Sequence, residues 1–223
     1  MNDDGCHGGE ALSAYEFMSK TNVTDETCSI YQGRGHDNGI ECAPINVCKN
    51  CMPGEPCFIP DEYLVYNVHE YGPVSGETAM MQEIYTYGPI ACGIAVPEAL
   101  MNYTGGIFID NTGASDIDHD ISVVGFGEED GVKYWMVRNS WGSYWGENGF
   151  FRVIRGVNNM MIESECAWAS PRDTWTDKWT HKTTDAEKND PRNKKYQSPS
   201  PVSEDGEFLK EQACKRIRNP KIR

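Results

Sequence analysis

The sequence predicts an α+β fold, in which a helix and a cysteine-rich segment precede a run of short strands. Residues 9–20 place Leu12, Tyr15 and Met18 near one face of a helix. From Tyr63 onward, short apolar stretches alternate with Gly or Pro, which is typical of an antiparallel sheet or barrel. The hydrophobic content of 39% is sufficient for a packed core, and 223 residues leave room for one or two domains.

Charge and hydropathy exclude two classes of partner. The net charge of −14 argues against nucleic acid, because phosphate binding requires a basic surface. No stretch approaches the roughly 18 consecutive apolar residues of a membrane span. The acids dominate residues 1–170, whereas residues 171–223 are basic. We therefore expect no nucleic acid and no membrane span.

Six of the nine cysteines lie between Cys6 and Cys57, a density typical of oxidising compartments. The surrounding residues have no helical or strand periodicity. Cys48 and Cys51 have the C-x-x-C spacing of a redox or zinc motif. A second ligand pair at regular spacing is absent, so we favour disulfides and expect no metal.

The next segments alternate between strand and helix patterns. Residues 63–68 predict a strand, and a helix follows with Ser75 as N-cap and Gly88-Pro89 as its stop. Further short strands are then predicted at residues 90–96, 105–109, 120–126, 133–139 and 149–155.

This pattern divides the chain into residues 1–60, 61–170 and 171–223. The last segment is polar and rich in Lys, Asp, Ser and Pro, which predicts a disordered tail. Its basic end leaves open a role in binding a partner or an anionic surface.

A turn between two of the strands brings a histidine near an asparagine. A two-residue loop at Glu129-Asp130 places His119 opposite Asn139 to within one residue, which a bulge would absorb. An amide oxygen can fix the tautomer of an imidazole, whose other nitrogen then faces a nucleophile. A neutral Asn suits a cysteine nucleophile, since thiolate and imidazolium neutralise each other. The alternative is an ordinary cross-strand polar pair.

Four segments resemble the papain family of cysteine peptidases. They are "GCHGG", "YTGGIF", "DHDISVVGFG" and "YWMVRNSWGSYWGENGFFRV", and they occur in the order found in that family. The resemblance implies a papain-like two-domain fold, of which residues 1–60 would be a remnant of the helical domain and residues 61–170 the antiparallel β-barrel-like domain. It also implies peptide or protein substrates and no cofactor, and we expect a monomer.

The resemblance assigns a role to each matched residue. His119 resembles the catalytic base and Asn139 the residue that orients it. Trp141 resembles the indole that covers the His–Asn bond, and Trp145 a wall on the leaving-group side of the cleft.

Gly8 and Gly9 resemble the backbone that pairs with extended substrate, where the missing side chain permits close approach. The family resemblance further implies disulfides between Cys28 and Cys48, Cys51 and Cys57, and Cys92 and Cys166. Asp120 follows His119 where a small or apolar residue is usual. It either reaches the pocket for the substrate's second residue or faces solvent, and we favour solvent.

None of the nine cysteines lies in the C-G-[SA]-C-[WY] signature of the family nucleophile. That signature precedes the His and Asn by about 130–150 residues, which places it before Met1. The glutamine of the oxyanion hole would be absent with it. Cys6, Cys42 and Cys214 are left without partners. We therefore expect an N-terminally truncated and inactive cysteine peptidase, or alternatively a non-catalytic glycoprotein that binds peptides.

Two sequons, at Asn22 and Asn102, fit a secretory protein. The first residues lack the basic and apolar regions of a signal peptide. We expect the full-length form to be lysosomal or secreted.

Overall fold

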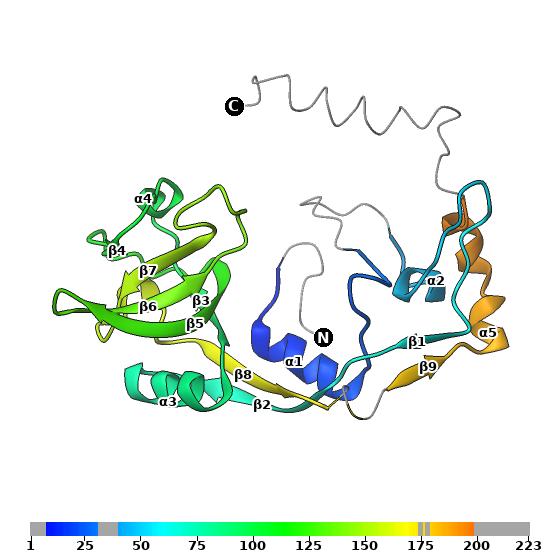
Figure 1. The fold of residues 1–223 in the computed structure, drawn as a ribbon, viewed down its shortest axis with the longest axis horizontal. Coiled ribbons are helices and arrows are strands. Elements are labelled where there is room, and N and C mark those ends of the chain that lie inside the picture. The colour runs from blue at the N-terminus through cyan, green and yellow to red at the C-terminus, as the bar shows by residue number, and fades with distance from the viewer. Residues whose placement is uncertain (1–7, 31–39, 174–175, 177–178, 199–223) are drawn as a thin grey trace, which may run out of the picture. The chain divides into compact units, whose positions relative to one another are not determined.

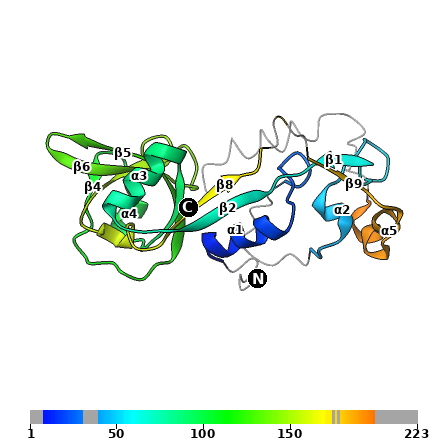
Figure 2. The ribbon, with the colours of Figure 1, turned by 90° about the horizontal axis from the view of Figure 1, so that it is seen from below.

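The structure is a computed structural model that describes residues 8–30, 40–173, 176 and 179–198. The chain forms two compact units. Unit 1 comprises residues 1–22 and 66–173, and unit 2 comprises residues 23–65 and 174–223. This division differs from the predicted boundary at residue 60, because α1 (Ala11–Lys20) packs beside strands β2 and β8 of unit 1 (Figures 1 and 2). The predictions for Cys6 and Cys214 concern residues outside those described.

Unit 1 is built on a seven-stranded sheet with the order β2-β8-β3-β5-β6-β7-β4 (Figure 1). All neighbouring strands are antiparallel except β4 and β7. This arrangement confirms the α+β prediction. The strands are β2 (Val68–Val74), β3 (Ile90–Ile94), β4 (Ile107–Phe108), β5 (His119–Glu129), β6 (Val132–Arg138), β7 (Phe150–Ile154) and β8 (Cys166–Pro171).

The helices of unit 1 are short. They are α1, α3 (Glu77–Tyr87), α4 (Glu98–Met101) and the 3₁₀ turn η2 (Asn159–Met161). The prediction of Ser75 as the N-cap of α3 was wrong. Gly76 occupies that position, so the helix begins without a side-chain cap. Gly88 ends the helix as predicted. Met80 and Ile84, one turn apart, are its buried residues.

The core of unit 1 follows the alternation of the strands. Trp135 and Val137 of β6 and Phe151 and Val153 of β7 are fully buried on one face. The disulfide between Cys92 and Cys166 joins β3 to β8 at residues that are direct strand partners, as the resemblance implied.

The strand predicted at residues 63–68 is in fact two strands. Its first half belongs to β1 (Glu62–Leu64) in unit 2, whereas Val68 begins β2 in unit 1. The two halves pair with different strands: Leu64 pairs with Thr180 of β9 (Thr180–Lys182), whereas Val68 pairs with Pro171 of β8.

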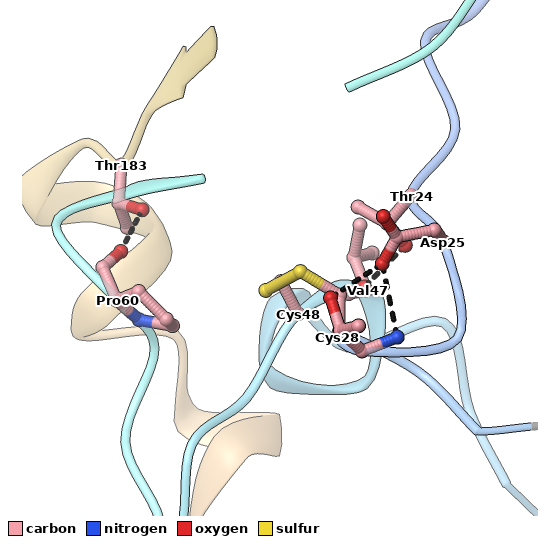
Figure 3. Close-up of a disulfide and its surroundings, with 8 residues drawn as sticks. Thr24, Asp25, Cys28, Val47, Cys48, Pro60 and Thr183 are labelled. Atoms are coloured by element: carbon pink, nitrogen blue, oxygen red, sulfur yellow. Dashed lines mark hydrogen bonds between the residues drawn. A yellow bond between two sulfur atoms is a disulfide. The ribbon is translucent and has the colours of Figure 1, made fainter. Parts of the chain in front are cut away.

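Unit 2 contains α2 (Pro44–Val47), β1, β9 (Thr180–Lys182), α5 (Asp185–Lys188) and the 3₁₀ helix η3 (Pro191–Tyr196). Disulfides Cys28–Cys48, seen in Figure 3, and Cys51–Cys57 are the pairs that the resemblance implied. The prediction of a disordered tail was wrong for residues 179–198. Thr184 and Glu187 form a capping box that starts α5, and β9 obtains its partner from distant β1.

Within the described residues, no helix has the length and apolar character needed to cross a membrane.

We predict that the Cys92–Cys166 disulfide stabilises unit 1 more than a disulfide that closes a short loop would, because its two cysteines are 74 residues apart in the sequence. Replacing both cysteines with Ala should cost about 4 kcal/mol of unfolding free energy, since the unfolded chain regains the entropy of the closed loop. Urea denaturation followed at the Val137 amide measures this loss. The double Ala variant of Cys51 and Cys57, whose separation is 6, should leave that transition unchanged; an equal loss in both variants would contradict the prediction.

Candidate active site

The β5–β6 hairpin carries the candidate catalytic pair, and its turn fixes the strand register. The turn residues are Asp130 and Gly131, both with positive φ (51° and 79°). Glu129 pairs directly with Val132. The predicted loop at Glu129-Asp130 is therefore wrong by one residue, because an Asp-Gly pair adopts the left-handed backbone that a tight hairpin needs.

A bulge then shifts the register between Val123 and Gly125. Beyond it, Ser122 pairs with Arg138, so that Asn139 continues the strand two residues away from the position opposite His119. The two residues are diagonal neighbours, which long side chains can bridge. The predicted His–Asn contact is confirmed, although the predicted register was not.

The imidazole Nε2 of His119 lies 2.9 Å from Oδ1 of Asn139. That same oxygen accepts the backbone N–H of Ser140 at 2.8 Å, which identifies it as the acceptor end of the amide. Because a carbonyl oxygen cannot donate, Nε2 must carry the hydrogen. The Nδ1 atom of His119 is then the nitrogen that can accept a proton.

One indole covers the imidazole of His119, and a second indole supports the first. The Trp141 ring stacks on the imidazole of His119, with centroids 5.1 Å apart and planes at 30°. Trp145 packs edge-on against Trp141 at 4.9 Å, and its Nε1 donates to the carbonyl of Met101. Trp145 is only 7% exposed. It therefore supports Trp141 from within the core.

The loop after β6 holds Asn139 at both its backbone and its side chain. The N–H of Asn139 donates to the carbonyl of Gly149, so the loop of residues 139–149 closes on its first residue. Gly146 has a φ of 56°, and a Cβ there would lie 2.6 Å from the carbonyl of Phe150. The W-G-x-x-G pattern thus has a steric reason.

Two residues that the sequence analysis did not single out help to place the pair. Asp118 accepts the N–H of Val96 at 3.0 Å and fixes the start of β5 immediately before His119. Glu147 holds Arg152 through Oε1 and Oε2, which anchors the loop to β7. Asp118 lies in the "DHD" segment and Glu147 in "WGENG", so the motifs that pointed to His119 and Asn139 also contained these two supporting residues.

Asp120 is exposed, as predicted, and it also lines a cavity of about 160 Å³ within unit 1. Glu10 and Glu165 also line this cavity. Although the residue is exposed overall, partial burial of its carboxyl group raises the pKa of Asp120; His119 acts in the opposite direction, and nearby Glu10 raises the pKa further. Gly8 (φ 124°) and Gly9 directly precede Glu10, so this segment runs to the cavity.

The zinc interpretation of Cys48 and Cys51 is excluded, because each is bonded to another cysteine. The described part of the chain contains no group of three or more His, Cys, Asp or Glu that could hold a metal ion.

Comparisons with known proteins show the family to which the chain belongs. A family model described as "Papain family cysteine protease" matches residues 1–170. Cathepsin Z of Onchocerca volvulus is 44% identical over 179 residues, which cover 76% of this chain and 56% of that protein. Cathepsin B-like CP1 of Giardia intestinalis is 35% identical over 164 residues, covering 72% and 50%. The chain thus spans about half the length of the curated relatives it matches.

Solved structures show the same fold. Digestive procathepsin L 3 of Tenebrio molitor larval midgut matches with a TM-score of 0.58 at 26% identity, covering 75% of this chain and 50% of that one. The procathepsin L2 proteinase of the same source matches with a TM-score of 0.60 at 25% identity, covering 76% and 49%.

We predict that Asn139 fixes the tautomer of His119. In Asn139→Leu the acceptor is lost, so the ring should populate both neutral tautomers and its N–H should exchange rapidly with water. Long-range ¹⁵N–¹H spectra of the imidazole measure this change. Asn111→Leu, at an exposed position, should leave the ring signals as they are. An unaltered Nε2–H tautomer in Asn139→Leu would show that another group orients the ring.

We predict that Glu10→Gln lowers the pKa of Asp120 toward its ordinary value. Removing a nearby negative charge makes the charged carboxylate of Asp120 less unfavourable. A ¹³C titration of the side-chain carboxyls gives the two midpoints. Glu98→Gln on α4 is the control that should not change it. A pKa of Asp120 that stays constant in Glu10→Gln would leave burial as its sole cause.

Proposed function

Because the chain belongs to the papain family of cysteine proteases, we propose that it carries the base half of a peptidase active site. In this proposal His119 is the general base, Asn139 orients it and Trp141 shields their hydrogen bond. The reaction is hydrolysis of peptide bonds through a cysteine thiolate, and no metal or cofactor takes part.

The contact between His119 Nε2 and Asn139 Oδ1 is the observation that carries this proposal. It fixes the tautomer in which Nδ1 is the proton-accepting nitrogen, as a nucleophile requires. Asn139 is only 9% exposed, and Trp141 covers one face of the ring. Exclusion of water keeps the imidazole in one orientation through the reaction.

The proposed chemistry has two steps. His119 takes the proton of a cysteine thiol, and the thiolate attacks the scissile carbonyl. As the carbon–nitrogen bond breaks, the imidazolium gives its proton to the leaving amine, and an acyl-enzyme remains. His119 then accepts a proton from water, whose oxygen forms the new bond to the acyl carbon. The carbon–sulfur bond breaks, and the imidazolium returns its proton to the departing thiolate.

We further propose that the nucleophile and the oxyanion glutamine belong to a segment that this sequence does not include. None of the nine cysteines lies in the family signature. The chain by itself would then be inactive. The 44% identity with a cathepsin Z favours a cathepsin Z-like enzyme. Within this proposal, carboxypeptidase activity is the mode to test first.

The proposal includes a lysosomal or secreted location and glycosylation. The side chains of Asn22 and Asn102 are exposed, so both sequons are accessible. The three disulfides are consistent with an oxidising compartment.

We predict that the chain alone neither cleaves peptides nor reacts with an epoxide probe for active-site thiols, whereas a version extended by the upstream segment with the C-G-x-C-W motif does both. In that longer protein, His119→Ala should lower kcat/KM by at least about 10³-fold, because thiolate formation and amine protonation both lose their proton carrier. Peptide turnover and mass spectrometry of the labelled protein provide the two measurements.

The exposed His69 on β2 offers a matched control, since His69→Ala should retain full activity. If the upstream coding sequence lacks the motif and the extended protein binds peptides without cleaving them, the non-catalytic alternative is correct.

A further inference from the structure

The chain continues past residue 170, where the family match ends, and residues 179–198 of this continuation contain a strand and two short helices. Residues 179–198, which we name the C-terminal clasp, lie in unit 2 with residues 23–65. We propose that the clasp is a structural part of the disulfide-rich unit and holds residues 41–65 in their fold. This inference is independent of the proposed catalytic function.

The clasp first adds a strand to an edge. β9 pairs with β1 through Thr180, His181 and Lys182. The pairing continues at both ends, because Val65 donates its N–H to the carbonyl of Trp179 and Thr183 donates its own to Asp61, each at 2.9 Å. The Thr183 hydroxyl also bonds the carbonyl of Pro60 (Figure 3). Within the described residues β1 has no other strand partner, so these groups depend on the clasp.

The clasp next supplies a buried cap for α2. Asn193 is 1% exposed, and its Oδ1 accepts the N–H of Ile45 at 3.2 Å. Ile45 lies in the first turn of α2, where backbone N–H groups have no partner within the helix. The Asn193 amide nitrogen donates to the carbonyl of Glu187 at 2.7 Å. One side chain thus joins α2 to α5.

The clasp finally covers a small core. That core consists of Ala43, Ile45, Cys57 and Ile59. The Tyr196 ring packs against it, and the Tyr196 hydroxyl accepts the N–H of Glu41 at 2.9 Å. Cys57 donates its N–H to the carbonyl of Gln197 at 3.1 Å. A core of this size buries too little apolar surface to be stable by itself, so an added aromatic ring has a large relative effect.

Ion pairs contribute less to the clasp. Lys188 with Asp61 and Lys195 with Glu41 are all more than a third exposed. Such pairs are screened and weak. The clasp should therefore hold through backbone pairing, Asn193 and Tyr196, and high salt should not release it.

Hydrogen exchange of the full chain tests this directly. In the unchanged protein, the amides of Ile45, Cys57 and Val65 should exchange together with those of Thr183 and Asn193, because they open in one step. In Asn193→Ala the Ile45 amide should exchange at least about tenfold faster, since it loses its buried acceptor. Val137 in unit 1 should be unaffected.

Asn189→Ala is the matched control, because Asn189 is exposed and, among the described residues, its side chain bonds only to the carbonyl of Asp185 in α5. It should leave the Ile45 amide protected. Equal exchange at Ile45 in the unchanged protein and in Asn193→Ala would overturn the capping role.

A chain ending at residue 173 tests the whole clasp, with a chain ending at residue 198 as control. The shorter chain should lose protection at Ile45 and Val65 and keep it at Val137. Retained protection at Ile45 and Val65 would overturn the proposal. Loss at Val137 as well would also count against it, since the strand pairing of the clasp and the contacts of Asn193 and Tyr196 lie in unit 2.

Discussion

The register of the β5–β6 hairpin is the constraint on which the rest of unit 1 depends. These two strands lie at the middle of the seven-stranded sheet, so each also sets the position of an outer neighbour. A shift by one residue would move Trp135 and Val137 from the core to the opposite face. The left-handed backbone at Asp130 and Gly131 prevents that shift at one end of the hairpin. At the other end, the same register delivers His119 and Asn139 to each other.

The amide of Asn139 shows how the site combines stability with chemistry. Its oxygen is fully used, because it accepts from both His119 and Ser140. Its nitrogen is buried and has no hydrogen-bond partner among the described residues. An unsatisfied buried donor costs about 1–3 kcal/mol. An apolar side chain would avoid that cost but could not fix a tautomer, so the position favours chemistry over stability.

Local signals in the sequence predicted much of unit 1 and little of unit 2. The apolar alternation gave strands β5, β6 and β7, and the turn residues brought His119 near Asn139. The hairpin register was missed because the Asp-Gly turn shifts the strand pairing by two residues from the predicted one, and the bulge at Val124 then shifts it back by one. The folded tail was missed for another reason: β9 is stabilised by β1, which lies more than a hundred residues earlier in the chain. Composition alone cannot reveal a partner at that distance.

The pairing of β1 with β9 also determines the order in which the molecule can be completed during synthesis. Thr180 bonds Glu62 across 118 residues, and the larger part of unit 1, residues 66–173, is encoded between them. The ribosome therefore produces the whole of the larger unit before it releases the last strand of the smaller one. Cys28, Cys48, Cys51 and Cys57 are synthesised while the rest of their unit is still missing. Correct pairing of these four must then rely on short sequence separations, and theirs are 20 and 6 residues.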